Sequence, residues 1–598
     1  MIVLGTILVT FFRLQVLGTH EFAIQSEQNR LRHVTIPAPR GLIVDRNGNV
    51  LADNIPGFTI SLLGASRDSL LATLQRMAGI VGLDSARIQG ILQSDRRNAE
   101  DQVVVRRDAP FTMVSALEER REAFPGLVIQ SEPKRQYPYG GLVAHIVGYV
   151  NEITEPELRR GTIEGARFGA LVGRTGIERE YDHRLRGIDG RRLLEVDALG
   201  RTVREIGIVP GSEARPGETI RTTIDVELQD FVERSFPVNG SGAVLAMDPR
   251  TGDILAMYSA PSFDPNLFVG GVDPAVWRAI RTAANNPMFN RALQGRYPPA
   301  SPWKLAVASM ALKRGIVTMQ SHMPTPCHGG MVYGNRYFRC WRAKGHGDIT
   351  LAEAIQHSCD VYFYQLGLQV GLENLLADGV QYGFNQPTGV DLPSEATSLF
   401  PASRAYFDQE YGPRGWTSGV TLNLAIGQGE NSQTLLNMVR FYAMLANDTG
   451  RAPRPRMTLD RPVDRTGVPD LGLDPAHILQ LRQALVSVVD RGTAVASRIA
   501  SLRIAGKTGT AQNPHGDDHG WFIAFAPADN PAIVVGAIVE YGKHGSAVAP
   551  MVTRIIARHL LGDDPVLDRP FQLRMPADSA PAPVPFVPDS VRRGGAGR

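Results

Sequence analysis

Cysteine is rare in this chain of 598 residues. Its 3 cysteines, Cys327, Cys340 and Cys359, all lie between positions 327 and 359. An odd number of thiols cannot be fully paired by disulfides within one chain, so cross-linking alone does not account for them. A short stretch that holds every thiol of the chain is therefore a candidate for a local site.

Lysine and net charge are also low. The formal net charge is +3 and charged residues make up 21% of the chain, so composition implies no nucleic-acid partner. Because a buried lysine can release its proton whereas an arginine cannot, each lysine is a candidate for proton transfer. The lysines are only Lys134, Lys304, Lys313, Lys344, Lys507 and Lys543.

The sequence lacks an apolar run long enough to span a membrane by itself. It opens with MIVLGTILVTFF, which is shorter than the roughly 20 residues that a span needs. The run has neither a basic start nor a cleavage site of small residues. A buried helix of a soluble domain is one interpretation. We expect instead the C-terminal part of a signal anchor at residues 1–18, which predicts a single-pass protein of the cytoplasmic (inner) membrane with its bulk in the periplasm.

The rest of the chain divides into three regions. Residues 19–220 combine short strands, a turn at Asn47-Gly48 and amphipathic helices. Residues 221–562 begin with two strands in GAVLAMDPRTGDILAMYS, alternate helices with short strands, and close with PAIVVGAIVEYG and the helix MVTRIIARHLL. Residues 563–598 are rich in Pro, Gly and Ala, which predicts a disordered tail.

The segment RYPPASPWKLAVASMAL contains a candidate nucleophile. Ser301 opens a helix after two prolines, and Lys304 lies on the same helical face. A partly desolvated lysine can accept the proton of a serine hydroxyl and so activate it. The alternative is an N-cap serine followed by an exposed lysine, since S-x-x-K is a short pattern.

Two further segments carry related chemistry. In AGKTGTAQ, Lys507, Thr508 and Thr510 offer a cation and hydroxyl donors to a carboxylate, and an edge strand there would pair with a peptide. A plain turn is the alternative. Ser358 and Asp360 precede the helical run VYFYQLGL, where a helix cap with an acidic first turn is the alternative.

The three segments occur in the order S-x-x-K, S-x-D, K-T-G, and in that order they resemble the motifs of the penicillin-binding and serine β-lactamase superfamily. IPAPRGLIVDRNGNVLA, GRTGIEREYDHRLRG, NRALQGRYPPASPWK and AIGQGE are similar to segments of the monofunctional, class B penicillin-binding proteins. Asp360 at the third position of the second motif is typical of the elongation-specific members. We find no separate glycosyltransferase region.

The resemblance implies an α+β fold. The transpeptidase domain, residues 221–562, would combine an antiparallel sheet flanked by helices with an all-helical part. Residues 19–220 would form an elongated, β-rich pedestal of the dimerisation type. The implied activity is that of a serine-type peptidoglycan D,D-transpeptidase, which cross-links stem peptides ending in D-Ala-D-Ala during cell elongation and is inhibited by β-lactams.

The resemblance also implies a role for each motif residue. Ser301 would attack the donor carbonyl, Lys304 would take its proton, and the backbone N–H groups of Ser301 and Thr510 would hold the oxyanion. Ser358 would relay a proton between the catalytic lysines Lys304 and Lys507 and the leaving amine, and Asp360 would orient the site. The implied substrate contacts are Lys507, Thr508, Gly509, Thr510 and Trp303. The segment departs from the family's more usual Gly-Ser-Thr, because Ala300 replaces the glycine and Pro302 follows the serine.

Two other functions are compatible with these motifs. A D,D-carboxypeptidase or a β-lactamase-like hydrolase differs only in letting water resolve the acyl-enzyme, but it needs neither an anchor nor a pedestal. The chain could also act primarily as a non-catalytic activator of a glycan polymerase of the SEDS (shape, elongation, division and sporulation) family. Whether the chain acts as a transpeptidase or as an activator, we expect its pedestal to contact that polymerase and other elongation-complex proteins.

Cys327, Cys340, His346 and Cys359 form the pattern C-x12-C-x5-H-x12-C. Three thiolates and one imidazole make a closed tetrahedral set of the kind that holds structural zinc, and the family resemblance also supports zinc at this place. One disulfide plus a free thiol is the alternative. His328, beside Cys327, is a possible substitute for His346.

Overall fold

The computed structural model describes Phe12 and residues 31–63, 67–94, 102–164, 169–197 and 202–562. The predicted membrane location is corrected here. Among the described residues, no helix combines the length and the apolar character that a membrane crossing requires. Apart from Phe12, segment 1–18 lies outside the described residues, as does the tail predicted at 563–598.

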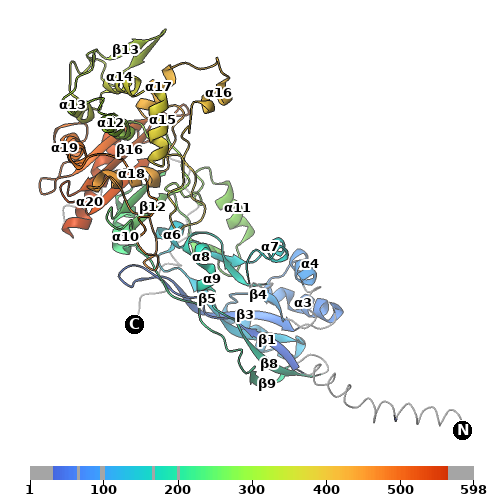
Figure 1. Cartoon of the computed structure of the whole chain (residues 1–598). Coiled ribbons are helices and arrows are strands. Elements are labelled where there is room, and N and C mark those ends of the chain that lie inside the picture. The colour runs from blue at the N-terminus through green and yellow to red at the C-terminus, as the bar shows by residue number, and fades with distance from the viewer. Residues whose placement is uncertain are drawn as a thin grey trace.

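The N-terminal region is an elongated pedestal that carries the C-terminal region at one end (Figure 1). Its sheets are β1-β8-β9, the pair β6-β7, and β10-β2-β3-β4 with β5 also paired to β3. The elements are β1 (Leu31–Ile36), β2 (Ile43–Val44), β3 (Val50–Leu63), α3 (Arg67–Val81), α4 (Ser85–Ser94), β4 (Gln102–Arg106), α5 (Phe111–Glu118), β5 (Leu127–Gln136), α6 (Ala144–Val147), β6 (Val150–Glu152), α7 (Glu155–Arg160), β7 (Leu171–Gly173), α8 (Gly176–Glu180), α9 (Asp182–Leu185), β8 (Gly190–Val196), β9 (Thr202–Ile208) and β10 (Ile220–Arg221).

A buried ion network joins two of the pedestal segments that carry the family resemblance. Glu178 accepts hydrogen bonds from Arg40 at 2.5 Å and from Arg135 at 2.6 Å. Burial would raise the pKa of Glu178, but the two guanidinium groups outweigh it and hold that pKa below its ordinary value. Arg40 also reaches Asp182 at 2.7 Å. PRGLIVD and GIEREYD therefore meet because a buried carboxylate requires paired cations.

The C-terminal region is built around one antiparallel sheet, ordered β12-β11-β17-β16-β15. The predicted strand pair in GAVLAMDPRTGDILAMYS forms β11 and β12, and AGKTGTA forms the edge strand β15. The elements are α10 (Val226–Ser235), β11 (Gly242–Met247), β12 (Ile254–Ala260), α11 (Pro274–Thr282), the 3-10 turn η6 (Ser301–Trp303), α12 (Lys304–Lys313), β13 (Gly330–Tyr333), β14 (Arg336–Arg339), α13 (Leu351–His357), α14 (Asp360–Val370), α15 (Leu372–Gln381), α16 (Ala405–Tyr411), α17 (Gly419–Ala425), α18 (Leu435–Ala446), α19 (Pro475–Arg491), β15 (Ala505–Ala511), β16 (His519–Ala526), β17 (Ile533–Val539) and α20 (Gly545–Leu561).

Helices cover both faces of this sheet. Gly536 lies against α18, whereas Gly520 lies against α20, and α10 packs beside α20. Gly536 pairs with Ile523, which lies in β16 an odd number of residues after Gly520. Because successive residues of a strand alternate between faces, Gly520 and Gly536 face opposite sides of the sheet. The helices α18 and α20 therefore cover opposite faces. With a separate helical part formed by α13 to α17, the predicted α+β class is confirmed.

The two regions are joined by backbone pairing and side chains. The Arg46 N–H donates to the Ile224 carbonyl at 2.8 Å, and the Asp45 carboxylate accepts a bond from the Val226 N–H at the start of α10. Tyr181 donates to Asp391 at 2.7 Å, and Arg184 pairs with Asp460 at 2.7 Å.

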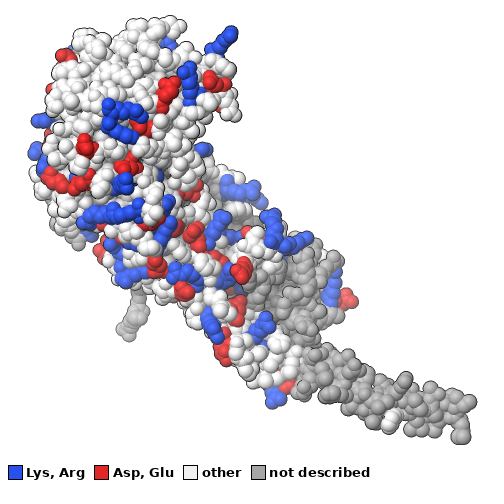
Figure 2. Space-filling model, viewed as in Figure 1, with Lys and Arg blue, Asp and Glu red and all other residues white. Residues whose placement is uncertain are grey.

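Positive and negative side chains are interspersed on the face seen in Figure 2. The domain limits expected near residues 220 and 562 stay predictions.

Candidate active site and metal-ligand cluster

The structure brings the three sequence motifs together around the start of α12. Ser301 begins η6, which runs directly into α12 at Lys304. η6 packs against β15, while α12 contacts α13 and α14. Ser301 is partly exposed, and Ser358 lies at the junction of α13 and α14. The nucleophile candidate thus sits between the K-T-G strand and the second motif.

The side chain of Lys304 is fully buried and is the hub of this site. Its Nζ donates to the Asp360 carboxylate at 2.7 Å, to the Ser358 carbonyl at 2.9 Å and to the Ser358 Oγ at 3.3 Å. Nζ also lies over the ring of Phe363, 5.5 Å from the ring centroid. The ammonium group is therefore fully partnered by the second motif, as a buried charge requires.

Trp341 contacts the same two acceptors from outside the core. Its backbone N–H donates to Asp360 at 2.9 Å, and its indole N–H reaches the carbonyls of Ser358 and His357 at 3.1 Å each. Ser358 itself has a positive φ of 56°. Sequence reasoning did not find Trp341, although its position directly after Cys340 in the cysteine-bearing stretch was a usable signal.

The K-T-G strand places a second buried lysine near the first. Burial lowers the pKa of Lys507 well below its ordinary value, and the positive charge of Lys304 lowers it further. Lys507 Nζ donates to the Thr508 carbonyl at 3.2 Å. The Thr508 hydroxyl lies 2.6 Å from the hydroxyl of Thr493, a partner that sequence reasoning missed, while Thr510 is partly exposed.

Gly509 has a packing role as well as a place in the K-T-G motif. It is buried, and a Cβ at this position would lie 2.5 Å from the Pro302 ring. The missing side chain therefore allows β15 to lie directly against η6. This contact sets the distance between the strand and the turn that carries Ser301.

Trp303 does not occupy the position predicted for it. Its side chain is only 1% exposed, and its ring packs against Phe384 and Phe400 at centroid distances of 4.4 and 5.2 Å. The predicted substrate contact is therefore corrected: Trp303 belongs to the core beneath the site. Its indole N–H has no partner among the described residues.

Ala300, directly before the nucleophile candidate, has φ 51° and ψ −140°. This region of backbone space is almost restricted to glycine and costs an L-residue about 1–3 kcal/mol. Its N–H donates to the Gly427 carbonyl at 2.9 Å. Gly427 must remain small, because a Cβ there would lie 2.4 Å from the Ala300 oxygen.

The four candidate metal ligands converge in space. One side-chain atom from each of Cys327, Cys340, His346 and Cys359 lies within 4.8 Å of all the others. His346 Nδ1 is 3.6 Å from the sulfurs of Cys327 and Cys340. A tetrahedral zinc site has bonds of about 2.0–2.3 Å to nitrogen and sulfur, which gives similar ligand separations. The ring of His328 is exposed and lies outside this cluster.

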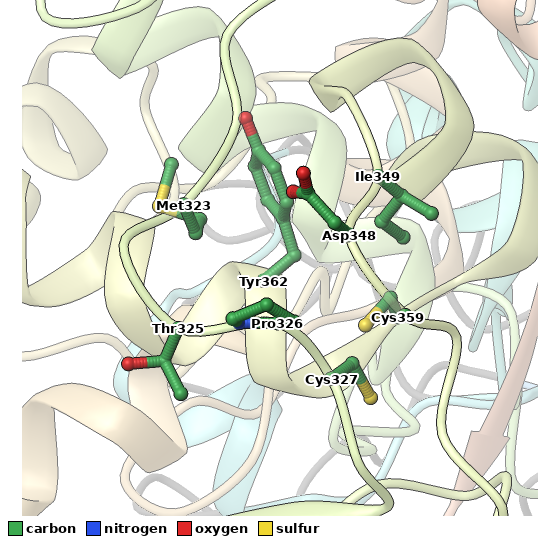
Figure 3. Close-up of a pocket in the computed structure, with 9 residues that line it drawn as sticks. Met323, Thr325, Pro326, Cys327, Asp348, Ile349, Cys359 and Tyr362 are labelled. Carbon is green, nitrogen blue, oxygen red and sulfur yellow. The ribbon is translucent and has the colours of Figure 1, made fainter.

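The three thiols are also free of disulfides, as metal ligands must be. All three cysteines are buried and free, and a hydrogen bond between Cys359 and Cys340 lowers the pKa of Cys340 and raises that of Cys359. A thiolate is the form that binds metal. Figure 3 shows Cys327 and Cys359 beside a small cavity that Met323 and Tyr362 also line. The donor set therefore fits zinc.

Comparison with known proteins gives matches over most of the chain. Residues 242–557 match the penicillin binding protein transpeptidase domain, and residues 35–222 match the penicillin-binding protein dimerisation domain. The peptidoglycan D,D-transpeptidase MrdA of Acinetobacter baumannii is 33% identical over 92% of this chain and 84% of that protein.

Two solved structures are similar along almost the whole chain. The penicillin-binding protein PBP2 of Helicobacter pylori, in complex with MreC, has a TM-score of 0.77 and 29% identity over 89% of this chain and 99% of that one. A structure from a peptidoglycan synthase complex, concerned with the coordination of polymerization and crosslinking, has a TM-score of 0.69 and 29% identity over 95% and 98% of the two chains.

The corrected position of Trp303 predicts the effect of its replacement on stability. Trp303→Ala should lower the free energy of unfolding by about 3–5 kcal/mol, because it leaves a cavity in the core. Trp303→Phe should cost only about 1 kcal/mol, since it keeps an apolar ring and removes an unpaired donor. Thermal unfolding of the purified variants measures both changes. An alanine variant as stable as the parent would contradict the core position.

Proposed function

Because the chain belongs to the penicillin-binding proteins, in the group of penicillin-binding protein 2, we propose that it cross-links peptidoglycan stem peptides as a D,D-transpeptidase through an acyl-enzyme on Ser301. One observation carries this proposal. The buried ammonium of Lys304, one helical turn from Ser301, bonds both polar residues of the second motif, Ser358 and Asp360. The cell-elongation role of the group is part of the proposal.

Acylation begins when Ser301 Oγ attacks the carbonyl of the penultimate D-Ala. A proton passes from the serine hydroxyl to Lys304, which must first have lost one to its oxygen partners or to solvent. The backbone N–H groups of Ser301 and Thr510 would stabilise the oxyanion, a contribution typically worth about 3–4 kcal/mol. The peptide C–N bond then breaks, and Ser358 relays a proton to the departing amine.

The K-T-G strand would bind the terminal carboxylate of the donor peptide. Thr510 is partly exposed, and Thr508 is oriented by its bond to Thr493. Lys507 is fully buried, so it would act through the strand it shapes and not by direct contact with the carboxylate. As an edge strand, β15 has free backbone groups with which an extended peptide can pair.

The acyl-enzyme is resolved when the amine of a second stem peptide attacks the ester carbonyl. A new amide bond forms, the ester C–O bond breaks, and the serine oxygen recovers a proton. β-Lactams would inhibit by acylating Ser301 in the same way. A hydrolase would use water as the nucleophile in this step. The pedestal argues for the transpeptidase, since attack by water needs no such domain.

A labelled penicillin tests the assignment of the nucleophile. Mass spectrometry should find one adduct on the peptide that contains Ser301, and Ser301→Ala should remove it. Lys304→Arg should also reduce labelling at least about 100-fold, because arginine keeps the charge but cannot accept the proton.

Thermal unfolding supplies the control for this experiment, because both variants must keep the parent's folded state. Lys344→Arg is a matched variant, since Lys344 is exposed, and it should label normally. An adduct on Ser358, or on no serine, would refute the proposed role of Ser301.

We further propose that Cys327, Cys340, His346 and Cys359 hold one structural zinc ion. The separations of their donor atoms and the burial of the three thiols support this proposal. A bound zinc ion supplies a closed tetrahedral cross-link with no position for water. Cys359 lies between Ser358 and Asp360, so the cross-link would hold the second motif against the loop that carries Cys340 and Trp341.

Metal analysis tests the zinc proposal. Protein purified without chelator should contain about one zinc ion per chain, and its cysteines should resist alkylation until the metal is removed. Cys340→Ser should lower the melting temperature and slow penicillin acylation together, because rate is sensitive to the placement of the second motif. A metal-free protein with a mapped disulfide and unchanged acylation would rule the site out.

We propose that the pedestal binds a SEDS-family glycan polymerase or another protein of the elongation complex. Its edge strand β9 exposes the apolar side chains of Val203, Ile206 and Ile208. An exposed apolar strip on an unpaired strand edge is a common protein-binding surface. The relatives in complex with MreC and within a peptidoglycan synthase complex are consistent with a partner protein.

Co-purification tests this surface. The full chain should co-purify with the polymerase, and Ile206→Ser/Ile208→Ser should reduce recovery about tenfold or more, since two apolar contacts are lost. Ser301→Ala should have no effect, because it lies in the other domain. Equal recovery of the polymerase with the Ile206→Ser/Ile208→Ser variant, or with a chain that lacks the pedestal, would contradict the proposal.

A further inference from the structure

The segment 327–347, which contains the hairpin of β13 and β14, forms a positively charged arm beside the candidate active site. From Cys327 to Gly347 the sequence contains no acidic residue. The same stretch carries four cationic side chains, all exposed, namely Arg336, Arg339, Arg342 and Lys344. In Figure 1 the hairpin projects from the end of the transpeptidase domain remote from the pedestal.

The cations of this arm have no partner within the described part of the chain. Elsewhere arginines commonly pair with carboxylates, including the buried pairs of Arg40 and Arg135 with Glu178. No ion pair or side-chain hydrogen bond within the described residues engages the four cations of the arm. Four like charges in one short arm repel one another, so this arrangement favours an anionic ligand.

The outer face of the arm also exposes apolar and aromatic surface. Val332 is 68% exposed and pairs with Tyr337, which is 57% exposed, and Trp341 is 61% exposed. Alternation along β14 places Arg339 on the same face as Tyr337. Aromatic rings beside guanidinium groups make a surface suited to a flexible peptide that carries carboxylates.

The arm is held firmly against the site. On its inner face Phe338 packs on Tyr364 of α14, and Tyr333 bonds Ser418 at 2.8 Å. At its base, Trp341 bonds the carbonyl of Ser358 and the carboxylate of Asp360. β15, which packs against η6, is the strand assigned to the donor peptide, whereas the arm contacts the second motif. The arm therefore flanks the site on the side that the donor leaves free.

We infer that the β13–β14 arm binds the carboxylate-bearing stem peptide of the acceptor strand and guides its amine to the acyl-enzyme. This inference rests on the proposed acyl-enzyme at Ser301. Every stem peptide carries at least a terminal carboxylate, and the donor's own is assigned to the K-T-G strand. The unpaired cations of the arm provide the complementary charge for the acceptor.

Two acceptor peptides test the inference. Full-length protein is acylated by a donor peptide, and transfer is followed with a synthetic stem peptide that has free carboxylates and with the same peptide amidated. The wild-type protein should reach half-saturation at a lower concentration of the free-carboxylate acceptor than of the amidated acceptor. Arg339→Gln/Arg342→Gln should raise that half-saturating concentration about fivefold, as expected for two exposed charge contacts, and leave the amidated acceptor and saturating transfer rate unchanged.

Matched variants separate charge from structure. Arg339→Lys/Arg342→Lys keeps the charge and should stay within about twofold of wild type. Arg278→Gln/Arg281→Gln removes two exposed charges from α11, away from the arm, and should change nothing. Zinc content and penicillin acylation should be the same in all variants, because neither uses the acceptor.

Two results would overturn the inference. One is an unchanged acceptor dependence in the Arg339→Gln/Arg342→Gln variant; if that variant also lost binding to vesicles of anionic phospholipid, the arm would be assigned to a lipid surface. The other is an equal change in the α11 variant. Absence of any acylation of the wild-type protein would instead refute the proposed function, which distinguishes the two failures.

Discussion

The ammonium group of Lys304 is the constraint on which the arrangement of the site depends. It is fully buried, and removing such a charge from water costs several kcal/mol unless charged and hydrogen-bonding partners replace the solvent. Here those partners are the Ser358 carbonyl, the Ser358 hydroxyl and the Asp360 carboxylate. The junction between α13 and α14 must therefore lie against α12, which fixes the second motif relative to Ser301.

The same junction is held from the opposite side by the cysteine-bearing loop. Trp341 donates to the Ser358 carbonyl and to the Asp360 carboxylate, the two groups that Lys304 also contacts. Cys340 precedes Trp341, and Cys359 lies between Ser358 and Asp360. A metal ion that joins these cysteines would shorten the path between loop and motif to a few covalent bonds. The proposed zinc site would account for the concentration of all three thiols in one stretch.

Much of this site could be predicted from sequence because its signals are local. Ser301 and Lys304 are one helical turn apart, and the glycine-containing K-T-G segment forms an edge strand as its composition indicates. The α+β class followed from the resemblance that the ordered motifs carry. Spacing left His328 as a substitute for the candidate ligand His346, whereas the fold brings the ring of His346 to the sulfurs.

Other features depend on contacts between distant segments. The rotation of Trp303 toward the core is set by Phe384 and Phe400, and sequence spacing around Ser301 has no information on them. The bond between Thr493 and Thr508 and the contacts of Trp341 likewise require tertiary packing. An aromatic residue beside a nucleophile is therefore a weak indicator of substrate contact.

The unusual segment around Ser301 is best understood as one rigid turn. The backbone of Ala300 costs about 1–3 kcal/mol, whereas truncating a buried aromatic side chain of the size of Trp303 to alanine costs about 3–5 kcal/mol. The carbonyl of Pro302 also accepts a bond from Tyr442 at 3.1 Å. The packing of Trp303 thus contributes more to stability than the backbone conformation of Ala300 costs. Because both flanking residues are fixed, the backbone of Ser301 is held in place before any substrate binds, and less entropy is lost on reaching the geometry of attack.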